Sequence, residues 1–227
     1  AGTHGVYRPG GSALNSGQVG SLRAAQYAAA HRRPFADDAA FAALAAGVLD
    51  RHLAMTAAVT AKKDNAQVLL KAAQRRMSVS GGAIRNAAVI ARALDETKAL
   101  LADFSREVGA DTAAGLVTAY KLRDILLSQA MYLSAMLSYI QAGGLSRGSA
   151  IYTAPEGQAA KGLEDIFRFL PDDGKLDDSV MILHYNGDGI TTTSRKVRPL
   201  PTGGGFFENV WRSYREDGNV NYDVEAQ

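Results

Sequence analysis

The chain contains no cysteine among its 227 residues. It therefore has no disulfide, no thiolate nucleophile and no cysteinyl iron–sulfur cluster of its own. Its four histidines (His4, His31, His52 and His184) are scattered without metal-ligand spacing, so we predict no metal site. A chain without cysteine fits a cytoplasmic location, which we take as our expectation.

Charge and hydrophobicity also exclude several functions. The net charge is only +2, which gives no general argument for binding nucleic acid or an anionic membrane. No basic segment followed by an apolar core marks a secretory signal. The most apolar long run, ILLSQAMYLSAMLSYI, contains Ser and Gln and is shorter than the roughly 20 residues of a membrane span. We interpret it as a buried core helix and expect no transmembrane segment.

Apolar residues make up 47% of the chain, enough for a packed core, and the sequence divides into three parts. We predict a glycine-rich turn and helix over 1–34, a helical bundle over 35–142, and an extension with a β-hairpin over 143–227. The first helix is expected from about Asn15 to His31, capped by Asn15 or Ser16. The predicted fold class is thus mainly α, an antiparallel helical bundle with a C-terminal β-hairpin tail.

Periodicity supports the bundle. Leu44, Val48, His52 and Met55 recur at spacings of three and four, which places them on one helix face. The stretch Asp111–Ala142 is typical of one helix of about thirty residues.

Caps and breaks delimit the predicted helices. Asp64 and Asp111 stand where N-caps belong, while Gly81, Gly82 and Gly109 are natural breaks.

The extension has a different character. Two β-branched runs flank Asn186-Gly187-Asp188-Gly189, a strong hairpin signal. We assign no regular element after Pro201 and interpret the aromatic residues there as docking the tail onto another domain or subunit. These are Phe206, Phe207, Trp211, Tyr214 and Tyr222.

An acidic cluster in the extension has two interpretations. Asp172, Asp173, Asp177 and Asp178 form either a solvated acidic turn, which we favour, or a cation site.

The segment HGVYRPGGSAL suggests a ligand site on physical grounds. Gly10 and Gly11 lack Cβ atoms, so backbone can approach a flat or anionic ligand closely. A helix N-terminus follows, which favours negative charge, and Arg8 is able to clamp a carboxylate. The alternative is a structural turn with a solvated arginine.

The same segment resembles the last flavin-contacting segment of the flavoprotein family of succinate dehydrogenase, fumarate reductase and L-aspartate oxidase. The family motif His-Gly-x-x-Arg-x-Gly-x-x-(Ser/Ala)-Leu reads here from His4 to Leu14. Three later stretches resemble family segments in the same order: QRRMSVSGGAIRN, YKLRDILLSQAMYLSAMLSYIQAGGLSRGSAIY and GDGITTTSRKVRPLP. The resemblance therefore spans almost the whole chain.

The resemblance implies roles at individual positions. Arg8 matches the arginine that binds the substrate carboxylate, which makes it the implied catalytic residue, and Gly11 borders the same substrate. Ala13 and Leu14 match the pair whose backbone N–H groups approach the flavin O2/N1 edge.

The neighbouring Gly10 and Ser12 are implied cofactor contacts. His4 is interpreted as a packed or turn-bracing residue.

Departures from the family bear on the substrate. Where the family has ESRGAH, this chain has LSRGSA, so the acid and the histidine are missing around Arg147. Arg147 is then either a structural arginine at the junction of the bundle and the flavin domain, which we favour, or a second substrate contact.

The family's nucleotide-binding G-x-G-x-x-G precedes the matching region. We therefore expect an FAD-dependent oxidoreductase that is incomplete without an N-terminal FAD-binding half, supplied by a separate chain or a preceding segment. It would transfer a hydride between flavin and a carboxylate-bearing substrate. An iron–sulfur electron-transfer subunit and a position peripheral to a membrane complex are further implications. The alternative is a non-catalytic helical partner of a flavoprotein complex.

Overall fold

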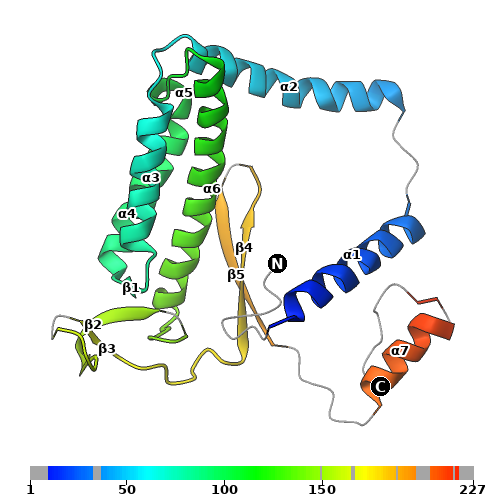
Figure 1. The fold of residues 1–227 in the computed structure, drawn as a ribbon, viewed down its shortest axis with the longest axis vertical. Coiled ribbons are helices and arrows are strands. Elements are labelled where there is room, and N and C mark those ends of the chain that lie inside the picture. The colour runs from blue at the N-terminus through cyan, green and yellow to red at the C-terminus, as the bar shows by residue number, and fades with distance from the viewer. Residues whose placement is uncertain are drawn as a thin grey trace. The chain divides into compact units, whose positions relative to one another are not determined.

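A computed structural model describes residues 10–32, 37–148, 150–164, 167–187, 189–197, 205–216 and 218–219, without the side chains of Phe206 and Phe207. The chain divides into two compact units: one comprises Ala1–Phe41 and Arg198–Gln227, and the other Ala42–Val197. The described residues are mainly helical, with the strands gathered largely in the C-terminal part, which confirms the mainly α class (Figure 1).

The second unit is built on three long helices that pack on one another: α3 (Ala66–Ser80), α4 (Ala87–Ala102) and α6 (Ala113–Gln141). In Figure 1 they lie side by side, with α4 running opposite to its two neighbours. The short helix α5 (Phe104–Glu107) connects α4 to the turn before α6. This arrangement agrees with the predicted bundle, and α6 covers nearly the whole of the stretch predicted as one long helix.

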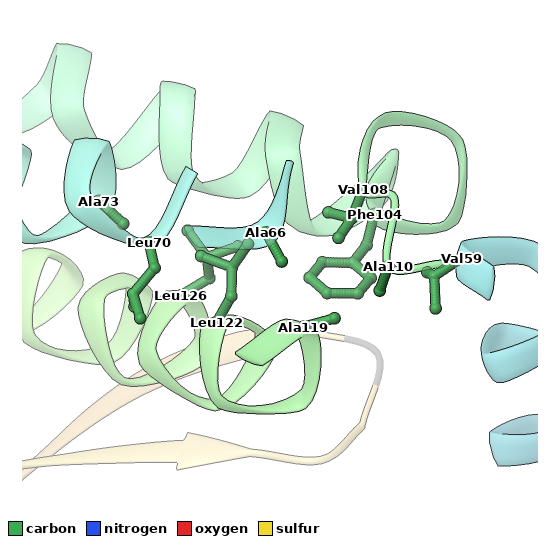
Figure 2. Close-up of a cluster of buried hydrophobic side chains, with 10 residues drawn as sticks. All are labelled: Val59, Ala66, Leu70, Ala73, Phe104, Val108, Ala110, Ala119, Leu122 and Leu126. Atoms are coloured by element: carbon green, nitrogen blue, oxygen red, sulfur yellow. The ribbon is translucent and has the colours of Figure 1, made fainter. Parts of the chain in front are cut away.

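Two sets of buried side chains hold the bundle together. The larger set comes from α3, α5, α6 and the end of α2 (Asp38–Thr60), and Figure 2 shows its members converging around Phe104 and Leu122. The smaller set joins α4 to the second half of α6 through Ile90, Ala93, Leu94, Ala130 and Leu133. The apolar run that ends α6 is therefore a core helix, as its sequence predicts.

The predicted caps were close to the observed ones. Asp64 accepts a hydrogen bond from Ala66 N at 3.1 Å, although the N-cap position of α3 is Asn65. Thr112 rather than Asp111 caps α6, because its hydroxyl accepts from Gly115 N at 3.0 Å.

Asp111 instead accepts from Asp64 N at 3.1 Å, which ties together the two turns that precede α3 and α6.

The strand region holds more than a hairpin. Strands β4 (Ser179–Tyr185) and β5 (Ile190–Lys196) pair antiparallel around the predicted turn, and both pack on α6. A second, three-stranded sheet has the order β1–β2–β3, in which the central strand is β2 (Ile151–Ala159). The sequence interpretation missed all three strands of this sheet, and the outer two, β1 (Ile84–Arg85) and β3 (Arg168–Phe169), have only two residues each.

The first unit contains α1 (Ser12–Ala30) and α7 (Phe206–Glu216). Helix α7 was not predicted from the sequence. Helix α1 matches its predicted extent but begins three residues before Asn15, so neither Asn15 nor Ser16 caps it. The cause is Gly11, whose φ of +81° turns the chain directly into the helix.

Candidate functional site

The predicted flavin edge lies at the first turn of α1. Its N-cap, Gly11, offers no side-chain hydrogen bond to the helix. The first main-chain hydrogen bond runs from Asn15 N to Gly11 O at 3.4 Å. The N–H groups of Ala13 and Leu14 therefore come before the first closed turn of the helix.

As far as the described residues go, the space beside this turn is open. A Cβ atom placed on Gly10 or Gly11 would meet no described atom within 4 Å. Ala13 is exposed and Leu14 is 68% exposed, so the helix N-terminus is accessible to a ligand. Such a terminus attracts negative or electronegative groups, because its N–H groups and the helix dipole point outward. Arg8 and His4 lie outside the described residues.

Helix α7 contacts the side of α1 farther along the chain. Gln26 Nε2 donates to the Tyr214 hydroxyl at 2.8 Å, and the Arg23 guanidinium lies 4.7 Å from the centre of the Tyr214 ring. Trp211 packs beside Tyr214, with 5.9 Å between ring centres. Tyr214 thus docks α7 onto α1 within one unit of the chain.

Arg147 lies between two carboxylates in the other unit. Its Nη1 donates to Asp177 Oδ1 at 2.7 Å, and its Nε lies 3.4 Å from Asp172 Oδ2. The hydrogen bond that Arg147 donates to Asp177 raises the pKa of the Arg147 guanidinium. Nearby, burial raises the pKa of Tyr139, and the charge of Asp172 raises it further. Because both carboxylates engage the guanidinium, the geometry favours the structural interpretation of Arg147 over a substrate contact.

The remaining acidic residues of this region are also engaged. Asp173 accepts from Lys175 N at 3.0 Å, and Asp178 pairs with Lys196 and accepts from the Ser179 hydroxyl at 2.8 Å. Across the described part of the chain, no group of three or more His, Asp or Glu side chains is placed to hold a metal ion. The cluster is therefore a network of ion pairs and turn hydrogen bonds.

The sequence interpretation missed a cavity of about 570 Å³ beside the three-stranded sheet. Its walls come from the end of α3, from β1 and the start of α4, and from β2 and β3. The residues that line it are mostly apolar, with two arginines, an asparagine and a threonine: Val79, Ile84, Arg85, Asn86, Val89, Thr153, Ala154, Pro155, Phe167 and Arg168.

Hydrogen bonds to neutral groups fix the first of these arginines. Arg85 donates from Nε to Gly82 O at 2.8 Å and from Nη1 to the Tyr152 hydroxyl at 2.9 Å. The parallel pairing of β1 with β2 brings these two residues together, because Arg85 is in register with Tyr152. For this arginine, the only signal in the sequence was the glycine pair before Ile84-Arg85. The stretch that resembles the flavoprotein family includes this pair, but the resemblance assigned no role to Arg85.

A second cavity of about 350 Å³ adjoins the first along the groove between α3 and α4, and the two share Val79 and Val89. Three arginines line it, and Arg76 Nε donates to Glu96 Oε2 at 3.0 Å. The other two are Arg75 and Arg92, both exposed.

Helix α2 has the length and composition of a possible membrane span. Its most apolar 18-residue window has a mean hydropathy of 1.2, and 6% of that window is buried. Since core helices of soluble proteins can meet the same test, this is weak support for a span, and the absence of a transmembrane segment stays a prediction.

Comparison with known proteins found no match: no family model, no curated protein and no solved structure is significantly similar to this chain.

Proposed function

We propose that this chain is the C-terminal part or subunit of an FAD-dependent oxidoreductase that transfers a hydride between flavin and a carboxylate-bearing substrate. The sequence resemblance suggests the chemistry. The observation that carries the proposal is the open N-terminus of α1, entered through Gly11 at a φ of +81°. An FAD-binding half, on a partner chain or a preceding segment, would supply the nucleotide site, and an iron–sulfur subunit would accept or deliver electrons.

The first turn of α1 fits one edge of a flavin. Gly10 and Gly11 present backbone without side chains, which allows a flat ring to approach. The N–H groups of Ala13 and Leu14 can donate to electronegative atoms, and the helix dipole adds a favourable field for negative charge. When bound, the flavin supplies the hydride chemistry.

Arg8 would bind and orient the substrate. Its guanidinium is planar and always charged, so it can hold a carboxylate through two parallel hydrogen bonds. Gly11 would border the same substrate, because a side chain there would occupy the space beside the carboxylate. Positioning of this kind lowers the barrier to transfer by fixing the distance between the reacting atoms.

The alternative, a non-catalytic helical partner, has one observation in its favour. Helix α2 exposes large apolar side chains such as Phe41 and Leu44, at 64% and 72%. Exposed apolar surface of this kind is typical of a contact with another protein. The two functions differ in whether the native assembly contains flavin.

The test is the flavin content of the native assembly, purified through a tag on this chain. We expect a flavin absorption spectrum, together with a polypeptide mass under denaturing conditions that accounts for the nucleotide-binding half. The isolated 227-residue chain should bind no FAD, because the glycine-rich strand–turn–helix for the ADP moiety is absent from it. A colourless native assembly, or tight stoichiometric FAD binding by the isolated chain, would contradict the proposal.

A pair of glycine variants locates the flavin contact. Gly11→Ala places a side chain at a φ of +81°, which costs about 1–2 kcal/mol and distorts the entry to α1. Gly17→Ala is the control, since Gly17 lies inside the same helix with open space around it. We expect the flavin-to-protein ratio of the assembly to fall in the first variant and to stay unchanged in the second.

A further inference from the structure

We propose that the cavity beside the three-stranded sheet binds a small organic anion with a flat apolar body and a carboxylate or phosphate head. This site lies in the unit Ala42–Val197 and shares no residue with the flavin edge proposed on α1. Its volume of about 570 Å³ lies in the usual range for small-molecule sites.

Two arginines among the residues that line the cavity give this region its positive charge. Arg85 donates to Gly82 O and to the Tyr152 hydroxyl, and Arg168 Nε donates to Gly157 O at 2.8 Å. All of these acceptors are neutral. Among the described residues, no carboxylate forms an ion pair with either arginine, and none lines the cavity. The described lining therefore carries two positive charges that a bound anion would neutralise.

The arginines are also held in place before any ligand arrives. Arg85 makes three hydrogen bonds, the third from Nη2 to Gly81 O at 3.3 Å, and its guanidinium lies 5.5 Å from the centre of the Tyr152 ring. Arg168 is anchored where β3 passes very close to Gly157: a Cβ on that glycine would lie 2.2 Å from Phe169 O. Fixed charges lose little conformational entropy on binding, which favours affinity.

The other walls define the rest of the ligand. Phe167 and Pro155 present flat apolar surfaces, while Asn86 and Thr153 add polar groups that hydrogen-bond to each other at 2.9 Å. A flat hydrocarbon body can lie against the apolar walls while its anionic head meets the guanidinium groups. A free inorganic anion would use only the second of these interactions and should bind more weakly.

The test is calorimetric titration of the 227-residue chain with 1-naphthyl phosphate and with 1-naphthoate. We expect saturable binding of at least one, with a Kd on the order of 0.1–1 mM. The tighter of the two identifies the preferred head. Inorganic phosphate and the neutral 1-naphthol should each bind at least about tenfold more weakly. Equal binding of 1-naphthol, or no saturable binding of either anion, overturns the proposal.

Variants tie the binding to this cavity. Arg168→Gln removes one anchored charge and should weaken binding about tenfold or more. Arg195→Gln is a matched control, because Arg195 is also a strand arginine that donates to a backbone carbonyl, that of Lys196 at 3.1 Å, but lies on β5. The Arg195→Gln variant should bind the naphthyl anions as tightly as the parent chain does. Equal weakening in both variants indicates non-specific attraction and overturns the proposal.

A third variant covers the case in which Arg168→Gln does not fold. Ala154→Phe keeps both charges but fills the cavity, so binding should be lost while the far-ultraviolet circular dichroism is retained. Amide shifts in nuclear magnetic resonance spectra should move at Asn86 and Thr153 on titration of the parent chain. Retained affinity in Ala154→Phe, or shifts confined to Gly10–Leu14, contradicts the site.

Discussion

Helices α2 and α6 are both long and rich in alanine and leucine, yet they have opposite surroundings. Eight residues of α6 are buried, whereas Val59 is the buried residue of α2. The apolar face of α2 is continuous: Met55 and Val59 at its end join the core, while Leu44 and Val48 on the same face are exposed. An apolar helix face therefore predicts a helix, but it does not predict whether that face is packed in the core of the chain.

This contrast separates two kinds of residue. In the bundle, side chains determine stability, because each buried group touches several others. In the first turn of α1, where no residue is buried, side-chain truncations should leave stability almost untouched and should alter only what the helix contacts; Gly11, whose backbone conformation shapes the entry to the helix, is the exception. The following predictions test that separation.

The largest effect is expected for Arg8→Ala in the complete assembly. If Arg8 holds the substrate carboxylate, its loss should cost on the order of 3–5 kcal/mol of transition-state binding, a fall in kcat/KM of roughly 10²–10³-fold or more. Most of the flavin should remain bound, and Arg8→Lys should recover little, because an ammonium group cannot reproduce the bidentate contact. The measurement is kcat/KM beside the flavin-to-protein ratio; near-parental kinetics would remove Arg8 from the mechanism.

A pair of leucine variants compares the two helices directly. Leu126→Ala on α6 removes a side chain that is 0% exposed and should lower the free energy of unfolding by about 2–5 kcal/mol. Leu44→Ala on α2, where the leucine is 72% exposed, should change it by less than about 0.5 kcal/mol. Urea unfolding followed by circular dichroism measures both. Similar losses would mean that α2 is packed in this chain after all.

The sequence was informative where a signal is local and repeated. The long apolar stretch identified α6, and the Asn-Gly turn identified the pairing of β4 with β5, in which Asn186 N donates to Gly189 O at 3.3 Å. The sequence misled at Leu44, Val48 and His52, whose spacing marks a face of α2 that is exposed rather than packed in the bundle. It failed where structure depends on distant partners. Residues Ile84 and Arg85 form a strand only because Ile151 and Tyr152 lie alongside them, and no local pattern encodes that pairing.

Of the two candidate sites, one could be predicted from the sequence and the other could not. The turn at Gly10 and Gly11 was visible because glycines before a helix form a recognisable motif. The cavity beside the three-stranded sheet was not, because Arg85 and Arg168 are far apart in the sequence and meet only through β2. Helix α7 was missed although its signal is local: Val210, Trp211 and Tyr214 recur at helical spacing.

A smaller effect is expected from helix capping. Asn86 caps α4, since its side chain accepts from Ala88 N at 3.0 Å and from Val89 N at 3.2 Å. Asn86→Ala should lower the free energy of unfolding by about 1 kcal/mol. Asn15→Ala is the matched control within the first turn of α1, where Gly11 holds the cap position, and it should have almost no effect. Comparable losses in the two variants would contradict the separation between bundle and α1.

The smallest effect concerns Asp178, on the surface of the hairpin. Its hydrogen bond with Lys196 lowers the pKa of the Asp178 carboxyl below 3.8, and the Ser179 hydroxyl lowers it further. Since the folded pKa lies below the unfolded one, the ion pair stabilises the hairpin above pH 3.8, and this contribution is lost as the pH falls through the lower folded value. The contribution should be small, because exposed ion pairs are screened by water and salt.

Asp178→Asn should therefore weaken the hairpin slightly at pH 7 and remove part of its acid sensitivity. The measurement is amide hydrogen exchange of β4 and β5 at pH 7 and near pH 3, with each rate corrected for its intrinsic pH dependence. The parent chain should lose more protection than the variant between the two pH values, and high salt should reduce the difference at pH 7. Asp95→Asn on α4 is the control, because Asp95 is exposed on the bundle. Equal acid sensitivity in the parent chain and Asp178→Asn would show that the register between β4 and β5, rather than this ion pair, carries the stability of the hairpin.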